Sequence, residues 1–357
     1  MPSRKAKAKK SKSRVAVKQE PATFEALIKK LKRSQRRPVK IEPTNPGDLK
    51  NPFHTESGKP WLAKAWVVFL DILGFTDLVR ESSSNGTQAA LLDKLMAALN
   101  EAKEILHSGN AMASRFGGER APYGVKFFTD NIVLGFPVLD DGESEFGQLV
   151  FITGLYQYTL IKHGFFTRGG ISFGELYMDG EVVFGNGILE AYEAESKLAR
   201  DPRVVFAKSG VDLMLSHLAY YAKVSETPHN RHILVDSDSQ IFISYLAVPT
   251  DGLEELPEEF LDVLVVHRDL IAARLRTFAA NPQIRPKYEW AAIYHNHIVR
   301  EFYHLPDDYR LPDDLILATP RPLSKVYRRK GSFILKGDEK VAQFKSLFEY
   351  ESQRRPK

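Results

Sequence analysis

The stretch from Trp66 to Arg80, WVVFLDILGFTDLVR, constrains the fold of this chain more than any other segment. It opens with a run of apolar residues, which predicts a strand that is buried on both faces. Asp71 follows that run, and a glycine turn then leads into a helix whose N-cap we expect at Thr76 or Asp77. A carboxylate beside a helix N-terminus suits a metal-bound polyphosphate, because free N–H groups attract phosphate oxygens and the carboxylate holds the cation. The alternative is that Asp71 only caps the helix.

A second stretch, YGVKFFTDNIVLGFP from Tyr123 to Pro137, predicts two strands joined by a turn at residues 129–131. Asp130 would then lie at the tip of a hairpin. If both segments belong to one sheet, Asp71 and Asp130 meet at the same end of that sheet. Two carboxylates placed in this way can share two divalent ions roughly 3.5–4 Å apart, an arrangement used for in-line displacement at phosphorus.

These segments resemble a known family. FLDILGFTDLV, KFFTDNIVLGF and FTRGGISFGELYMDGEVVFGNGI occur in the order and spacing of the class III nucleotidyl cyclase catalytic domain, over about residues 64–215. Residues 69–76 match the family's F-x-D-I-x-G-F-T pattern at every defined position. More narrowly, the TRGGI run, the FGNGILEAYEAE helix start, the PRVV strand and the IRPKYEWAAIYHNHI segment are similar to the pyrimidine cyclases of bacterial antiphage defence.

The resemblance implies a phosphorus–oxygen lyase that converts UTP or CTP into the 3′,5′-cyclic monophosphate and pyrophosphate. The product, cyclic UMP or cyclic CMP, would be a second messenger of antiviral defence, and UTP is favoured on the resemblance alone. The resemblance also implies two divalent cations, Mn²⁺ or Mg²⁺, bound by the catalytic residues Asp71 and Asp130 and by the Ile72 carbonyl. Because two such domains pair head to tail in this family, we expect a homodimer with active sites at its interface.

The other site residues are carried over from the family's motifs. The phosphate-binding positions are Leu73, Gly74, Phe75, Thr76 and Arg168. The base-reading positions are Lys126 and Val182; Trp66 is not a motif position and is added because an aromatic side chain nearby in sequence could fill the space that a smaller base leaves. For Arg168, an internal salt bridge is the competing interpretation, since buried arginines are normally paired.

Several positions depart from the adenylate cyclase pattern. Val182 stands where those enzymes carry an aspartate that reads the base. Leu189 and Glu193 replace the family's transition-state Asn and Arg, an i, i+4 pair on one helix face. The transition-state cation is therefore unassigned, and Lys197 and Arg200 are candidates for it.

Three alternatives to a pyrimidine cyclase remain open. Lys126 matches a base-reading lysine of adenylate cyclases and favours ATP, whereas the lost transition-state pair favours a cyclase-like nucleotide-binding module without catalysis. The N-terminal tail allows nucleic-acid binding, because residues 1–40 carry a net charge of +13 against +5 for the whole chain, which leaves the rest at −8. We favour a disordered, solubilising tail, and nucleic acid is not an expected partner.

Composition sets further limits. The absence of cysteine excludes disulfides, cysteine–zinc sites and thiol catalysis. No apolar run approaches the roughly 18 residues of a membrane span, and the N-terminus has no signal-peptide pattern. We therefore expect a soluble, cytoplasmic protein with no membrane contact.

The order of elements predicts an α+β, ferredoxin-like class III cyclase catalytic domain with helices on one face, an N-terminal tail and a C-terminal strand/helix extension. The expected domains are residues 1–60 (a disordered basic tail, a short helix at 24–31 and a linker), 61–220 (the catalytic domain) and 221–357 (an extension packing on the catalytic domain or the dimer interface). Helices are expected at 89–106, 149–163, 188–199, 260–278 and 288–303, and strands at 164–177, 182–184, 203–206, 233–235 and 240–248. No chemistry is visible in the extension: residues 236–239 indicate a turn, and His295 and His297 indicate packing or surface histidines.

Overall fold

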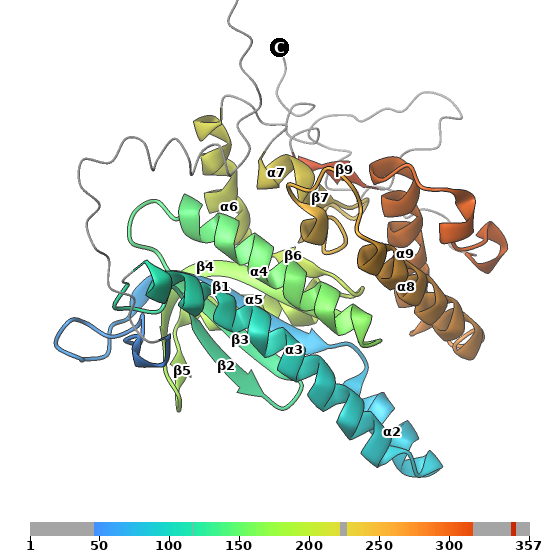
Figure 1. Ribbon diagram of the computed structural model, residues 1–357, viewed down its shortest axis with the longest axis horizontal. Coiled ribbons are helices and arrows are strands. Elements are labelled where there is room, and N and C mark those ends of the chain that lie inside the picture. The colour runs from blue at the N-terminus through green and yellow to red at the C-terminus, as the bar shows by residue number, and fades with distance from the viewer. Residues whose placement is uncertain (1–45, 117, 222–226, 317–343, 348–357) are drawn as a thin grey trace, which may run out of the picture. The chain divides into compact units, whose positions relative to one another are not determined.

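The computed structural model describes residues 46–116, 118–221, 227–316 and 344–347 (Figure 1). These residues belong to one compact unit that begins at Pro43. The predicted basic tail and the predicted helix at 24–31 lie outside the described residues.

One mixed sheet forms the body of this unit. Its strand order is β2-β3-β1-β4-β6-β8-β7-β9, with β5 paired to β4. The strands are β1 (Ala63–Ile72), β2 (Gly124–Phe128), β3 (Asn131–Pro137), β4 (Thr167–Met178), β5 (Val183–Phe184), β6 (Val204–Phe206), β7 (Ile233–Val235), β8 (Ile241–Ile243) and β9 (Lys345–Ser346). Pairing between them is antiparallel except for β4 with β6. The predicted α+β fold class and the predicted hairpin are confirmed.

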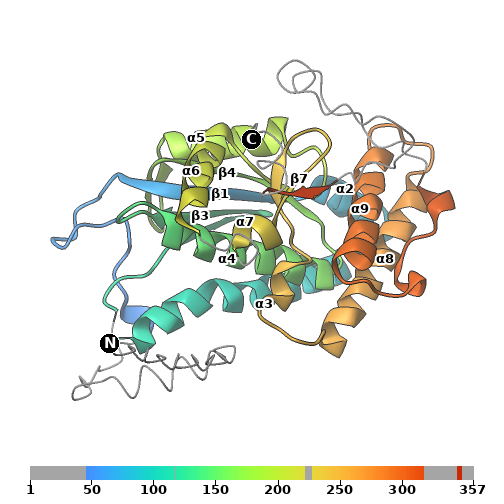
Figure 2. The ribbon, with the colours of Figure 1, turned by 90° about the horizontal axis from the view of Figure 1, so that it is seen from above.

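Helices cover both faces of the sheet. They are α2 (Phe75–Asn85), α3 (Gln88–Arg115), α4 (Glu143–Lys162), α5 (Asn186–Lys197), α6 (Lys208–His217), α7 (Pro228–Arg231), α8 (Glu258–Thr277) and α9 (Arg285–His297). Figure 2 shows α3 and α4 on one side of β1 and β4, and α5 on the other. The expectation of helices on one face was wrong, because β1 is apolar on both faces. Trp66 and Val68 pack in the α3–α4 core, whereas Val67 packs in the core beside α5.

The contact between α5 and β4 depends on a glycine. A Cβ atom on Gly170 would lie 2.0 Å from the Ala191 carbonyl oxygen and 2.8 Å from the Ala194 Cβ. Because no side chain tolerates such distances, only glycine lets the helix approach the strand this closely. Gly170 therefore sets how closely α5 packs on β4.

The C-terminal strands continue the same sheet. The turn expected at residues 236–239 joins β7 to β8, with the Asp236 N–H donating to the Gln240 carbonyl at 2.9 Å. Helices α8 and α9 pack over this part of the sheet in a core that includes Leu234 and Phe242. The sheet thus runs across the domain boundary that we expected at residue 220.

Two helices are longer than the sequence predicted. Helix α3 continues beyond residue 106, where the sequence predicted its end. Gly109 packs on the ring of Tyr123, and a Cβ atom at this glycine would lie 2.6 Å from that ring. Helix α4 begins at Glu143 rather than at residue 149. Within the described parts of the chain, no helix combines the length and apolar character that a membrane span needs.

Candidate active site

The register of the sheet brings Asp71 and Asp130 together. Strand β1 pairs with β3 so that Asp71 lies opposite Asn131, and Asp130 immediately precedes Asn131 in the turn that follows β2. Thr129 adopts a φ of 48° in this turn, and its hydroxyl donates to the Asp130 carboxylate at 2.7 Å. The two carboxylates are therefore neighbours at one end of the sheet.

The carboxyl of Asp71 has a perturbed acidity. Burial raises the pKa of Asp71 to about 6, the Arg168 guanidinium opposes this shift, and the Asp130 carboxylate adds to it. The Asp71 side chain is 17% exposed, so the carboxyl is shielded from water yet reachable. A carboxyl that resists ionisation for these reasons is stabilised as an anion when a cation binds beside it.

Arg168 and Glu195 complete a charged cluster. Arg168 lies opposite Asp71 across the β1–β4 pair, its Nε donates to Asp71 Oδ2 at 3.1 Å, and its Nη2 lies 2.7 Å from Glu195 Oε1. Arg168 thus forms the internal salt bridge that was the competing interpretation of this residue. Asp71 and Glu195 share this guanidinium, and Asp130 adds a third carboxylate beside Asp71. The excess negative charge and the all-oxygen donor set fit a divalent cation such as Mg²⁺ or Mn²⁺.

Sequence reasoning missed Glu195. This residue belongs to the buried stripe of α5, together with Ala191 and Ala194. Burial raises its pKa, the Arg168 guanidinium opposes that shift, and the Asp71 charge adds to it. The sequence signal for this residue was a glutamate within a helix stripe of otherwise small and apolar residues, because buried glutamates are normally paired.

The turn between β1 and α2 leaves backbone N–H groups open. Gly74 is the N-cap of α2 with a φ of 75°, and no side chain caps the helix. The N-cap prediction at Thr76 or Asp77 was wrong, because the left-handed glycine starts the helix earlier. No described residue accepts a hydrogen bond from the N–H groups of Gly74, Phe75 and Thr76.

Leu73 does not share this property. Its N–H donates to the Phe166 carbonyl at 2.8 Å, so Leu73 cannot offer that N–H to a phosphate. The same bond shows that residues 71 and 73 turn their peptide groups toward β4. Because peptide groups alternate along a strand, the Ile72 carbonyl points to the other side, where Asp130 lies.

The three base-reading candidates lie apart from these carboxylates. The Lys126 ammonium donates to the Gly180 carbonyl in the β4–β5 turn, and Val182, 48% exposed, ends the same turn. This turn follows the last residue of β4, whereas Arg168 stands near its first. Trp66 is fully buried, and its indole N–H donates to the Gly142 carbonyl at 2.9 Å. Trp66 therefore has no exposed surface on which a base could stack, and we withdraw it as a base contact.

The outer face of α5 carries no cation directed at the carboxylates. Leu189 is 66% exposed and Arg200 is also exposed. Lys197 forms an exposed ion pair with Glu193 at 3.1 Å. Neither cation candidate from the sequence contacts Asp71 or Asp130 in the described structure.

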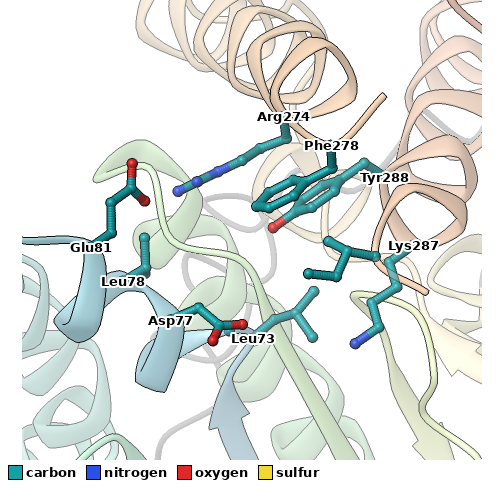
Figure 3. Close-up of a pocket in the computed structure, with 10 residues that line it drawn as sticks. Leu73, Asp77, Leu78, Glu81, Arg274, Phe278, Lys287 and Tyr288 are labelled. Carbon is teal, nitrogen blue, oxygen red and sulfur yellow. The ribbon is translucent and has the colours of Figure 1, made fainter. Parts of the chain in front are cut away.

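A small pocket lies beside the β1–α2 turn, between α2 and the C-terminal helices (Figure 3). Its volume is about 50 Å³. The lining residues are Leu73, Gly74, Asp77, Leu78, Glu81, Arg274, Phe278, Ile284, Lys287 and Tyr288. The C-terminal third, in which the sequence showed no chemistry, thus supplies half of this wall.

A second acidic cluster could also hold a metal ion by its spacing. One oxygen atom from each of Asp201, Asp236 and Asp238 lies within 4.8 Å of the others. The fully buried Arg203 guanidinium already bonds Asp236 and Asp238 and lies 3.6 Å from Asp201. Its positive charge offsets much of the negative charge that would attract a metal, so the cluster is better described as an ion-pair network.

Comparison with known proteins gave little similarity. No protein-family model matches the chain, and no curated protein matches it significantly. One solved structure found in the comparison is that of a class III adenylyl cyclase-like ATP-binding protein from Pseudomonas aeruginosa, with 13% sequence identity and a TM-score of 0.31. The match covers 53% of this chain and 43% of that one, so the chain spans less than half of its neighbour's length. A similarity this weak assigns no activity.

Proposed function

We propose that this chain is a metal-dependent nucleotidyl cyclase that acts on UTP or CTP as a cytoplasmic signal generator in antiphage defence. The observation that carries the proposal is the meeting of Asp71 and Asp130 beside a turn with three open N–H groups. Paired carboxylates next to a phosphate-binding turn suit a nucleoside triphosphate held through two divalent ions. The choice of a pyrimidine base rests on the sequence resemblance alone.

In the reaction, the ribose 3′ oxygen forms a bond to the α-phosphorus while the bond from that phosphorus to the bridging oxygen breaks. The electron pair leaves with pyrophosphate, and the hydroxyl proton passes to water. When bound, the two ions would supply the charge that favours loss of this proton and departure of pyrophosphate. Asp71, Asp130 and the Ile72 carbonyl would hold them.

The other residues orient these groups. Arg168 contacts both Asp71 and Glu195, so it would fix the rotamer of Asp71 and leave part of its guanidinium for phosphate. The N–H groups of Gly74, Phe75 and Thr76 would bind phosphate oxygens. Because Asp71 has a pKa of about 6 and binds a cation as the carboxylate, metal affinity should rise as the pH rises through 6.

We further propose that the active enzyme is a homodimer. Exposed apolar side chains gather near the base-reading turn and on α5, including Val182, Phe184, Leu189 and Tyr192. Such side chains together favour a protein interface. Pairing of two copies would let Lys126 of one chain serve the carboxylates of the other. Leu189→Asp should yield a monomer without turnover in sedimentation and activity assays, and an active monomer would refute the shared site.

The decisive experiment incubates the full chain with each of the four nucleoside triphosphates and Mn²⁺ and measures cyclic nucleotide and pyrophosphate. Turnover of UTP or CTP alone is expected, and turnover of ATP alone would replace the pyrimidine assignment. Asp71→Asn and Asp130→Asn should each abolish turnover without unfolding the chain. Asp93→Asn, an exposed substitution on α3, is the matched control.

A nucleotide-binding module without catalysis is the second candidate. The exposed Leu189 and the ion-paired Glu193 stand where the resembling enzymes have their transition-state pair. Binding of a nucleoside triphosphate that depends on Mn²⁺ and on Asp71, with no product from any of the four, would select this function.

A further inference from the structure

Two cations from the C-terminal helices line the pocket beside the β1–α2 turn. Arg274 lies in the last turn of α8, and Lys287 lies in the first turn of α9. Figure 3 shows the Arg274 side chain extending toward Glu81 on α2, whereas the Lys287 side chain extends away from Arg274, on the side of the pocket where Leu73 and Asp77 lie. The pocket thus joins the C-terminal extension to the turn that we assign to phosphate.

Neither cation has a partner of its own among the residues that the structure describes. Within the described ranges, no hydrogen bond or ion pair forms at the Lys287 ammonium or the Arg274 guanidinium, although both side chains are only half-exposed. Burial lowers the pKa of Lys287, and the nearby charge of Arg168 lowers it further. Asp201, Asp77 and Asp71 act in the opposite direction. Half-buried cations close to like charge and without a paired anion are an arrangement that an anionic ligand would relieve.

The size of the pocket restricts the ligand. Since one water occupies about 10–15 Å³ of such a volume, the observed value of about 50 Å³ holds about four water-sized groups. That space suits a phosphate group and excludes a nucleoside. A triphosphate would therefore enter with its terminal end, while the sugar and base stay outside.

We propose that Lys287, with Arg274 on the same pocket wall, binds the terminal phosphates of the nucleoside triphosphate and then the pyrophosphate product, the identity of this ligand resting on the proposed function. Lys287 lies within electrostatic range of Asp71 and of Asp77, which flank the β1–α2 turn on both sides. Phosphate groups bound by the N–H groups of that turn would lie next to the Lys287 ammonium. The cation that the sequence left unassigned is then supplied by α9 and not by α5.

The test titrates inorganic pyrophosphate into the full chain by calorimetry at fixed free Mg²⁺. Loss of one charged hydrogen bond in Lys287→Gln should weaken binding about ten- to a hundredfold. Arg274→Gln should weaken it less, and Lys287→Arg should stay close to the parent. Arg276→Gln is the matched control, because a residue two positions from Arg274 faces the other side of α8 and is exposed.

A further variant should change the affinity for pyrophosphate in the opposite direction. Asp77→Asn removes from the pocket a negative charge, which has the same sign as the ligand, and should tighten pyrophosphate binding. If Lys287→Gln binds pyrophosphate as the parent does, or if the parent does not bind it, the inference is overturned. Thermal unfolding verifies each variant, and should Lys287→Gln not fold, Lys287→Met, which keeps the aliphatic stem, takes its place.

Failure of the proposed function gives a different result. If no nucleotide is cyclised but Lys287→Gln still loses pyrophosphate binding, the pocket stands and the cyclase assignment falls. If the chain is an active cyclase whose KM and pyrophosphate inhibition are unchanged in Lys287→Gln, the cyclase stands and the pocket falls.

Discussion

Replacing Arg203 by methionine should greatly lower the free energy of unfolding of this domain. Arg203 is fully buried and bonds Asp236 and Asp238, with Asp201 at 3.6 Å. Methionine keeps much of the volume but removes the guanidinium charge from these carboxylates. Since burial already raises the pKa of Asp236 and Arg203 opposes that shift, the carboxylate depends on this guanidinium.

The expected loss is about 3–5 kcal/mol, the range found when one partner of a buried ion pair is removed. That is between about a fifth and the whole of a stability of about 5–15 kcal/mol. Urea unfolding followed by tryptophan fluorescence measures it, because Trp290 donates to Asp236 at 2.6 Å and reports on the same site. Arg300→Met, in an exposed pair with Glu301, is the control and should change stability by less than about 0.5 kcal/mol.

The same variant decides between the two acidic clusters as metal sites. In an Asp71→Asn background, Mn²⁺ should leave the chain with Arg203 unaffected and should stabilise Arg203→Met, because the guanidinium charge that offsets the three carboxylates is then removed. A metal at a hundred times its Kd would restore about 2.7 kcal/mol. A loss below about 1 kcal/mol, or Mn²⁺ stabilisation that needs Asp236 while Arg203 is present, would refute the ion-pair interpretation.

Three further outcomes follow from buried groups. Burial lowers the pKa of His267 and of His295, the latter to about 4. In urea titrations, the free energy of unfolding should therefore be highest above the unfolded-state pKa of about 6.5 and should fall as the pH drops toward 4; a flat profile would contradict this. Gly170→Ala should cost about 1–3 kcal/mol or more in thermal melts by pushing α5 off β4, whereas Gly180→Ala, with open space around it, should cost little. Tyr294→Phe removes the hydroxyl that accepts the Leu246 N–H at 3.0 Å and should cost about 1–3 kcal/mol in urea unfolding.

The local parts of the site could be predicted because they follow from short-range chemistry. The apolar run before Asp71 and the turn residues around Asp130 predict a strand end and a hairpin tip whatever the rest of the chain does. Once both strands share a sheet, their register places the two side chains together. The α+β class follows from the same alternation of strands and helices.

Features that depend on contacts between distant segments could not be predicted from the sequence in this way. Trp66 is an aromatic residue at a strand start, and only packing against Phe146 and Phe173 shows that it belongs to the core. Glu195 and Lys287 lie 124 and 216 positions after Asp71, and no periodicity connects them to it. Helix coverage of the second face was implied by the apolar character of β1, but the sequence does not say which helix provides it.

The C-terminal helices are tied to the site by a chain of contacts, which explains why their role escaped the sequence. Lys287 lies one turn before Trp290 on α9, and the Trp290 indole bonds Asp236, which in turn bonds Arg203. The Arg203 carbonyl accepts the Gly169 N–H at 3.1 Å, directly after Arg168 on β4. The buried ion-pair network therefore holds α9 at a fixed distance from the strand that carries Arg168. We therefore expect this network to position Lys287 against the Asp71 end of the sheet, a role that no residue in the extension shows by its type alone.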